Sequence, residues 1–355
     1  MSGGIVQLVA TGIQDVHLTG NPEISFFRSQ FKRHTQFAMS NELQLLQGVP
    51  GPGNISTIRF ERKGDLLSYV FLTARDGNAV LKGIDWGAAI DRVELLIGGQ
   101  VIDTQDYFFA NTISPLFISS TFATRFQPSN PTPLFFPLQF WFCKDWQSAL
   151  PLVALQFHDV ELRITWASTV NTSYEYRVWS NFVYLDKAER EFFANTPMDL
   201  IMWQVQRQIT SSSGAIMETA FNHPMKFLAF PAQLYTNQYQ TLRMQINGVD
   251  IGVDKSLISY SQVYPYYHTQ FGFDAQNSLY GQYPVGIIPF CLDTTKLQPT
   301  GTLNFSRLDT FRLVTSSNNT MRSTIFDTTR SQYLYGVNYN VLRIKSGMAG
   351  LLYSN

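Results

Sequence analysis

Hydrophobic positions along the chain alternate with polar ones or form short apolar blocks, a pattern that predicts strands. Val160, Leu162, Ile164 and Trp166 alternate with polar residues, as expected of a half-buried strand. Leu66–Thr73 is a nearly unbroken apolar run, which is typical of a central strand in a sandwich. Turn signals separate about eight such segments in each half of the chain, which is the strand count of a jelly roll.

The segment Tyr184–Gln206 interrupts this β pattern at mid-chain. Asp186 can accept from the free amides of a first helical turn, and Glu189 can reach back in a capping box. The helix should end before Pro197, because the residue before a proline is pushed out of the α region. A strand pattern resumes at Leu200–Val205. The helix is either a surface element of one large β domain or the join between two domains.

Internal repetition favours the join. Phe142–Phe157 matches the segment 148 residues later at six positions, including both cysteines, where roughly one match is expected by chance. Val93–Ile102 matches the segment 149 residues later, and both read as a strand, a Gly-Gly or Asn-Gly turn and a second strand. Asn181–Leu185 matches the segment 157 residues later. The sequence therefore predicts two copies of one β domain in tandem.

We expect an all-β fold of two tandem eight-stranded jelly rolls, joined by a short helix-containing linker. The expected boundaries are an N-terminal arm at residues 1–21, a first jelly roll at 22–185, the linker at 186–199 and a second jelly roll at 200–355. Long surface loops are expected at Tyr107–Phe136 and Tyr260–Tyr283, where strand signals are weakest.

The arm has too many apolar side chains for an exposed tail and too many glycines and polar residues for a helix. We expect an extended segment laid against this chain's own base or a neighbouring subunit. Phe26, Phe27 and Phe31 interleave with cations, which could indicate stacking on nucleic acid, but a strand with one buried face is the favoured interpretation. The candidate contact residues are Ile5, Val6, Leu8, Val9, Phe26, Phe27, Lys32 and Arg33.

Composition indicates a covered surface. Only 15% of residues are charged, against a usual value of about 25%, and charged residues are depleted at the cores of subunit interfaces. The net charge is zero, so the chain lacks the basic footprint of a nucleic-acid-binding protein. Cys143 and Cys291 lie at equivalent repeat positions, so we expect free buried thiols in corresponding strands and in a reducing compartment.

A search for reactive groups finds no catalytic, cofactor-binding or metal motif. The five histidines lack zinc-site spacing, and His158 with Asp159 and Glu161 comes nearest to a metal cluster. Asp103 and Asp106 are a carboxylate pair that a glycosidase could use, but as loop residues they are more simply solvated turn formers. We expect a protein that is no enzyme and has no cofactor.

Four stretches resemble a known family, the double jelly-roll major capsid proteins of nucleocytoplasmic large DNA viruses such as iridoviruses, phycodnaviruses and mimivirus relatives. They are GGIVQLVATGIQDVHLTGNPEISFFRSQFKRHTQF at residues 3–37, ALPLVALQFHDVELRI at 149–164, QPTGTLNFSRLDTFRL at 298–313 and GVNYNVLRIKSGMAGLLYSN at 336–355. The similarity runs essentially from end to end.

The resemblance implies a homotrimeric, pseudo-hexameric capsomer that tiles an icosahedral virion capsid assembled in the host cytoplasm. It implies that the arm runs along the inner side of the shell and that the two expected loop regions form a low outer crown. The implied partners are other copies of the chain, neighbouring capsomers and minor capsid and vertex proteins. It implies no sequence-specific nucleic-acid binding, and proximity to an inner membrane without insertion.

Three alternatives stay open on sequence alone. A shorter capsid paralogue is one, because the chain is short for the family. A carbohydrate-binding or glycosidase jelly roll is another, and it predicts an aromatic pocket with paired carboxylates in one half only. A minor vertex protein is disfavoured, since such proteins resemble single jelly rolls. A pseudo-hexagonal tile of three subunits needs two similar wedges in each subunit, which the repeat supplies.

Overall fold

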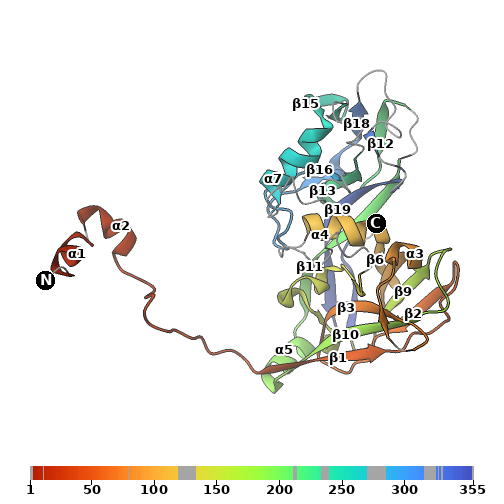
Figure 1. The fold of residues 1–355 in the computed structure, drawn as a ribbon, viewed down its shortest axis with the longest axis horizontal. Helices are drawn as coiled ribbons and strands as arrows, with labels where there is room; N and C mark the ends of the chain where they lie inside the picture. Colours follow the sequence, from red (N-terminus) through yellow and green to blue (C-terminus); the bar gives the residue numbers. More distant parts are fainter. Residues whose placement is uncertain are drawn as a thin grey trace. The chain divides into compact units, whose positions relative to one another are not determined.

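The structure, a computed structural model, describes residues 3–10, 12–78, 80–118, 133–210, 214–232, 240–269, 285–315, 325–326, 328 and 331–353. The chain divides into two units, Met1–Gln36 and Phe37–Asn355 (Figure 1). The first unit is the arm. The second holds the β-sheets.

The arm contains helices, so the expectation of an extended segment at residues 1–21 is wrong. Helix α1 spans Gly3–Val9, the 3-10 turn η1 spans Ile13–Asp15 and helix α2 spans Val16–Thr19. The glycines lie at the ends of these elements, where they weaken a helix least. The Asp15 carboxylate also accepts a hydrogen bond of 2.6 Å from Gly12 N and so stabilises the start of η1.

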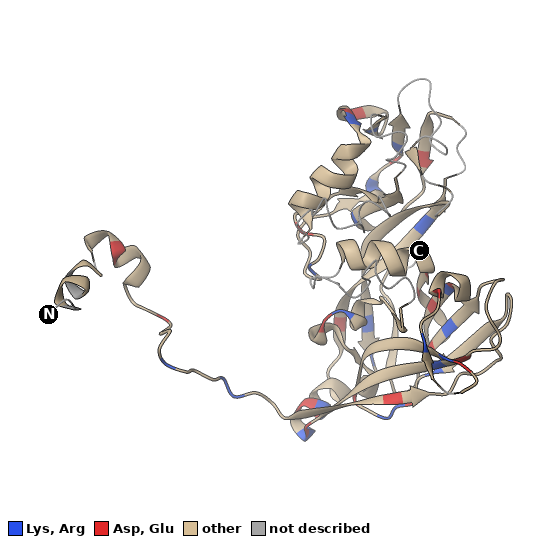
Figure 2. Ribbon diagram, viewed as in Figure 1, with Lys and Arg blue, Asp and Glu red and all other residues tan. Residues whose placement is uncertain are grey.

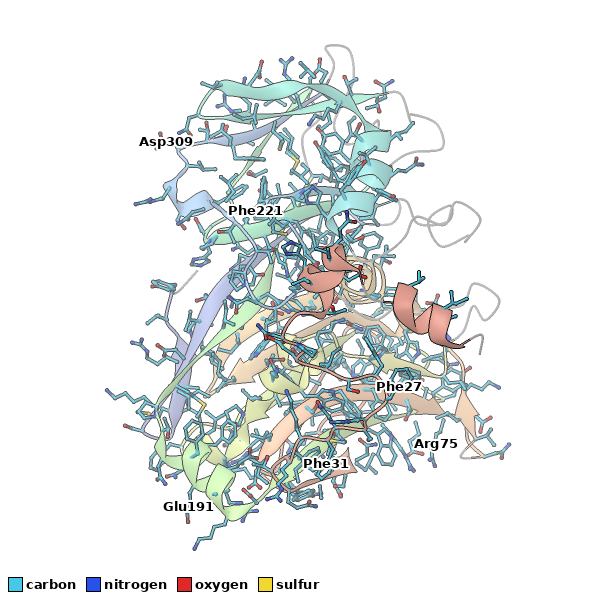
Figure 3. All side chains as sticks on the ribbon, turned by 90° about the vertical axis from the view of Figure 1, so that its left-hand side faces the viewer. Phe27, Phe31, Arg75, Glu191, Phe221 and Asp309 are labelled. Carbon is cyan, nitrogen blue, oxygen red and sulfur yellow. The ribbon has the colours of Figure 1, made fainter. Side chains whose placement is uncertain are left out.

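The segment that follows the arm helices is not the start of the first jelly roll. The expected boundary at residue 22 is too early, because the first strand, β1, spans Phe37–Gln44 and the compact unit begins with it. Phe26, Phe27 and Phe31 are 89%, 99% and 86% exposed, and Figure 3 marks two of these rings. The favoured interpretation of these aromatics as a strand with a buried face is therefore wrong.

Two β-sheets, one of six strands and one of four, form the first jelly roll (Figure 1). One sheet has the order β1-β10-β3-β4, with β7 and β8 also pairing with β3, and the other has the order β2-β9-β5-β6. The further strands are β2 (Ile55–Arg59), β3 (Leu66–Arg75), β4 (Leu81–Lys82), β5 (Ile90–Ile97), β6 (Gln100–Asp106), β7 (Phe135–Pro137), β8 (Leu150–Pro151), β9 (Val160–Trp166) and β10 (Glu175–Leu185). Short helical turns join them at α3 (Trp86–Ala89), η4 (Trp141–Cys143), η5 (Trp146–Ser148) and η6 (Leu152–Ala154).

The second jelly roll repeats this arrangement. Its sheets have the orders β11-β19-β13-β16, with β17 pairing with β13 and β20 with β19, and β12-β18-β14-β15. The strands are β11 (Met198–Ile209), β12 (Ile216–Thr219), β13 (Pro224–Pro231), β14 (Thr241–Ile246), β15 (Val249–Ser256), β16 (Val285–Pro289), β17 (Leu303–Asn304), β18 (Phe311–Thr315), β19 (Tyr333–Lys345) and β20 (Met348–Leu351), with the 3-10 turn η8 at Phe305–Arg307. The fold prediction of two tandem jelly rolls is confirmed.

The repeated hairpins are confirmed in backbone detail. Gly98 and Gly99 both have positive φ, and so do Asn247 and Gly248 at the corresponding turn. A two-residue hairpin turn with positive φ at both residues has a backbone twist that matches the twist of the flanking strands. Glycine and asparagine adopt positive φ most easily. The repeat detected in sequence therefore reports the same turn in both jelly rolls.

The linker helix is also confirmed. Helix α5 spans Lys187–Asn195, and Asp186 Oδ1 accepts a hydrogen bond of 3.0 Å from Glu189 N. Thr196, the residue before the proline, has an extended backbone and ends the helix. Strand β11 then begins the second jelly roll at Met198.

The two expected loop regions each begin with a helix. In the first, the π-helical turn η2 (Phe109–Ile113) runs into α4 (Ser114–Phe117), and in the second, η7 (Ser259–Val263) runs into α7 (Tyr264–His268). Each short α-helix carries proline in its first turn, where no backbone hydrogen bond is lost. The loop prediction is wrong for these segments, and residues 119–132 and 270–284 lie outside the described part of the chain.

Two principal clusters of buried apolar residues stabilise the compact unit. One fills the first jelly roll and continues into the second, where Phe227 and Val337 belong to it, and the other fills the interior of the second jelly roll. Both cysteines are free, as expected. The prediction that they lie in strands is wrong, because Cys143 lies in η4 and Cys291 follows β16.

Candidate assembly surfaces

The joint between the two jelly rolls of one chain is an apolar contact onto the outer face of a sheet. Val205, Val337 and Phe227 are cross-strand neighbours on β11, β19 and β13. Helix α4 of the first jelly roll lies over them, with the ring centroids of Phe117 and Phe227 6.1 Å apart. These side chains belong to the cluster that continues from the first core. This face of the sheet is therefore already buried within the folded monomer.

Asp103 is buried at this joint, which corrects its interpretation as a solvated loop residue. It lies in β6, and 3% of the residue is exposed. Its carboxylate accepts hydrogen bonds from Thr104 N at 3.0 Å, from Val205 N at 2.9 Å and from Gln105 Nε2 at 2.8 Å. The hydrogen bond from Val205 links the edge of the first jelly roll to strand β11 of the second.

Asp106 makes a second polar link across the joint. Its carboxylate accepts from Phe109 N at 2.9 Å, from the Tyr335 hydroxyl at 2.8 Å and from Arg207 Nη1 at 3.3 Å. Burial raises the pKa of Asp106, while these donors oppose the shift. The predicted role as a solvated turn former is wrong for Asp106 as well, because its oxygens bind donors on both jelly rolls.

A pH-dependent stability is expected from Asp103. Burial raises its pKa to about 7, against the three hydrogen bonds, so the folded chain holds this proton more tightly than the unfolded chain. The resulting stabilisation is present at low pH and is lost as pH rises through about 7. Asp103→Asn cannot ionise, so its free energy of unfolding relative to wild type should rise by about 1–3 kcal/mol between roughly pH 5 and pH 8. Urea denaturation across this range measures the difference, and a difference that does not change with pH contradicts the assignment.

The residues nearest to a metal pattern have other partners. His158 Nδ1 lies 2.9 Å from Ala349 O, on β20 of the second jelly roll. Asp159 pairs with Arg59 at 2.5 Å and with Arg62 at 3.6 Å. Within the described ranges, no group of three His, Cys, Asp or Glu side chains could hold a metal ion.

A cleft of about 690 Å³ opens between the duplicated segments of the two jelly rolls. Lys226, 1% exposed, lies on its wall, donates from Nζ to Lys296 O at 2.6 Å and sits over the Tyr339 ring. Burial lowers the pKa of Lys226 to about 8. The lining residues are Ile118, Trp141, Lys144, Asp145, Trp146, Gln147, Ile201, Trp203, Lys226, Thr295, Lys296, Leu297 and Gln298.

The predicted contact residues of the arm are exposed within their own unit. Ile5 and Val6 are each 69% exposed and Val9 is 77% exposed on α1, whereas the side chain of Leu8 lies outside what the structure describes. The other candidates, Phe26, Phe27, Lys32 and Arg33, are exposed in the irregular segment that follows the helices. Their role in contacts between capsomers stays a prediction.

The compact unit carries charges of both signs over its two jelly rolls, and neither sign dominates (Figure 2). None of the helices in the described ranges is both long and apolar enough to cross a membrane.

Sequence reasoning missed an aromatic surface on the outer face of the first jelly roll, where Phe71 and Trp179 stack with ring centroids 6.5 Å apart. The apolar run of β3 and the aromatic residues of β10 were visible in the sequence, but they do not show that the two rings are neighbours.

Comparison with known proteins places both halves in one family. The family model described as "Major capsid protein N-terminus" matches residues 25–186, and that of "Large eukaryotic DNA virus major capsid protein" matches residues 240–350. The major capsid protein of Pyramimonas orientalis virus is 30% identical over 404 residues, and that of Paramecium bursaria Chlorella virus 1 is 29% identical over 449, each with 100% of both chains covered.

Solved structures agree with these relatives. The chain matches the structure described as the PBCV-1 virus capsid with a TM-score of 0.74 and 27% identity, covering 93% of this chain and 100% of that one. The Faustovirus major capsid protein matches with a TM-score of 0.59 and 11% identity over 97% of each chain, which shows a shared fold.

Proposed function

The chain belongs to the major capsid proteins of large eukaryotic DNA viruses, and from this premise we propose that three copies form the pseudo-hexameric capsomer of an icosahedral virion shell. The observation that supports the proposal best is the duplication. The main strands pair in equivalent orders in both jelly rolls, β1-β10-β3-β7 and β2-β9-β5-β6 in the first and β11-β19-β13-β16 and β12-β18-β14-β15 in the second. Three subunits with two similar wedges each can close a ring of six. The protein's function then lies in its surfaces.

Exposed apolar side chains on the compact unit support a trimer. Trp146, Val249, Val253 and Tyr267 are 62%, 65%, 76% and 72% exposed. The charged content of only 15% also fits surfaces covered by neighbouring subunits, because charged residues are depleted at interface cores. Burial between subunits removes this surface from water.

The arm, residues 1–36, is proposed to run along the inner side of the shell and to contact neighbouring capsomers, minor capsid proteins and vertex proteins. Its described apolar side chains and the cations Lys32 and Arg33 are exposed within their own unit. Contact with partners would bury that apolar surface and offset the entropy lost on ordering. In this position the arm would lie near an inner membrane without inserting into it. The shell is proposed to assemble in the host cytoplasm.

This chain is proposed to be the dominant protein of the shell. The alternative is that it is a shorter paralogue of that protein. The alignments of 404 and 449 residues with full-length relatives exceed the 355 residues of this chain, so the relatives carry insertions and the outer crown here should be low. The carbohydrate-binding alternative is not favoured. Its paired carboxylates, Asp103 and Asp106, are instead buried hydrogen-bond acceptors at the joint between the jelly rolls.

Size-exclusion chromatography with light scattering tests the proposed trimer. We expect a single species of about three times the chain mass of 40.4 kDa at micromolar concentration. A stable monomer under these conditions overturns the proposal.

A further inference from the structure

Within one chain, the first jelly roll covers the second through a defined set of elements. Strand β6 lies along β11, and the turn η2 and helix α4 that follow β6 lie on the outer face of the β11-β19-β13 sheet (Figure 1). Phe117 of α4 contacts Phe227, and Phe109 of η2 contacts Trp203 with ring centroids 6.2 Å apart. The stripe beneath α4 is formed by Val205, Val337 and Phe227.

The first jelly roll carries the corresponding stripe, which the described residues of the compact unit leave partly exposed. Phe71 pairs with Pro137 as Phe227 pairs with Pro289, so the two phenylalanines hold equivalent positions in the repeat. Across β3, β10 and β1, the register places Phe71 beside Trp179 and Trp179 beside Leu43. We call these three residues the outer stripe.

The outer stripe is apolar and accessible. Leu43 is 42% exposed, and Phe71 and Trp179 are half-buried and stack on each other. Phe135, 38% exposed, extends the surface and makes an edge contact with Phe71 at 6.1 Å between ring centroids. The equivalent residues of the second jelly roll, Val337 and Phe227, are completely buried.

The second jelly roll has counterparts of β6, η2 and α4, namely β15, η7 and α7, and they carry exposed side chains. Helix α7 follows η7 as α4 follows η2, each has proline as its second residue, and Tyr267 stands 150 residues after Phe117. Phe117 is fully buried, whereas Tyr267 is 72% exposed and Tyr266 is 60% exposed. Strand β15, the counterpart of β6, has Val249 and Val253 exposed.

We propose that α7 of one copy packs on the outer stripe of the next copy, with Tyr267 against Phe71, as α4 packs on the second jelly roll within a chain. This assignment rests on the proposed trimer and names the surfaces that build it. A free covering helix and a free stripe on every chain make a head-to-tail contact, and such contacts close a ring when three copies return to the start. Each joint in the ring of six jelly rolls would then use the same geometry.

The contact between copies should be less polar than the joint within a chain. In the repeat register of the hairpin, Asp103 corresponds to Gly252, so the carboxylate that accepts from Val205 N has no counterpart at that position. Apolar contact with Tyr267 and the exposed valines of β15 would then carry most of the association.

Cross-linking of paired cysteines tests which surfaces meet. Purified Phe71→Cys/Tyr267→Cys chains treated with a short bismaleimide should give covalent dimers and trimers on a denaturing gel. Each single variant and the wild-type chain should stay monomeric on the gel, because the proposed contact places position 71 of one copy against position 267 of the next and leaves a single cysteine without a partner there. Phe192→Cys/Tyr267→Cys is the matched control, since Phe192 is an exposed ring on α5, 59% accessible, and it should not give this ladder.

Charge substitution tests the energetics. Tyr267→Asp should leave the chain folded, because the side chain is exposed in the monomer, but should weaken the trimer by roughly 30-fold or more, as loss of an interface hot spot does. Phe192→Asp should leave the trimer intact. If the wild-type chain is trimeric, yet the cysteine pair gives no ladder and Tyr267→Asp keeps its mass, this interface is wrong and the proposed trimer stands. A monomeric wild-type chain overturns both.

Discussion

Replacing Asp106 with alanine is expected to lower the free energy of unfolding by about 3 kcal/mol, as removal of one partner from a buried ionic network does. Asp106 accepts from Phe109 N, from Arg207 and from the Tyr335 hydroxyl at the joint between the jelly rolls. Its loss leaves those donors without their acceptor and opens a small cavity beneath η2. The substitution should therefore destabilise the contact between the two halves of the chain.

Urea denaturation followed by circular dichroism measures this loss. Asp309→Ala is the matched control, because Asp309 is exposed near the hairpin of the second jelly roll (Figure 3) and should change stability by less than about 0.5 kcal/mol. Asp106→Asn, which keeps an acceptor oxygen, should fall between the two. A loss below about 1 kcal/mol for Asp106→Ala would show that the network contributes little to the joint.

Removing residues 1–36 is expected to abolish or strongly impair assembly of capsomers into shells while leaving the trimer and its melting temperature nearly unchanged. The sheets and the two principal buried clusters begin after Gln36, so the core does not depend on the arm. The apolar side chains of the arm are exposed within its own unit, so we expect partners to cover them in the shell. Electron microscopy of assembled particles and thermal melting of the purified trimer measure the two effects.

A milder variant separates the contributions within the arm. Changing Phe26, Phe27 and Phe31 to alanine together removes the most exposed rings of the arm and should impair assembly in the same direction. Phe192→Ala on α5 is the control and should assemble normally. If the shortened chain fails to fold or to form trimers, the arm belongs to the domain core and its assignment as a contact between capsomers is wrong.

The architecture was predictable where local rules fix the backbone. Asn247-Gly248 and Gly98-Gly99 require a tight hairpin turn wherever they stand between strands, and the structure has positive φ at all four residues. Asp186 and Pro197 bracket the linker helix for equally local reasons. Because the same local signals recur about 150 residues apart, the duplication could be found before any tertiary contact was known.

Predictions that depended on the position of a residue in three dimensions were less successful. Asp103 and Asp106 looked like turn formers because both are polar and near a turn, but the second jelly roll covers them. The glycines of the arm argued against helices, yet they lie at helix ends. The outer stripe joins Leu43, Phe71 and Trp179 from three strands, and no sequence period reveals such a neighbourhood.

Cryo-electron microscopy of the purified chain is the most direct test of the capsomer. A map that resolves β-sheets should show three chains and six jelly rolls in one ring, with α7 of each chain on the β1-β10-β3 face of the next. Joints within and between chains should then superpose. A monomer, or a ring with a different number of jelly rolls, would contradict the assignment of this protein as a pseudo-hexameric capsid tile.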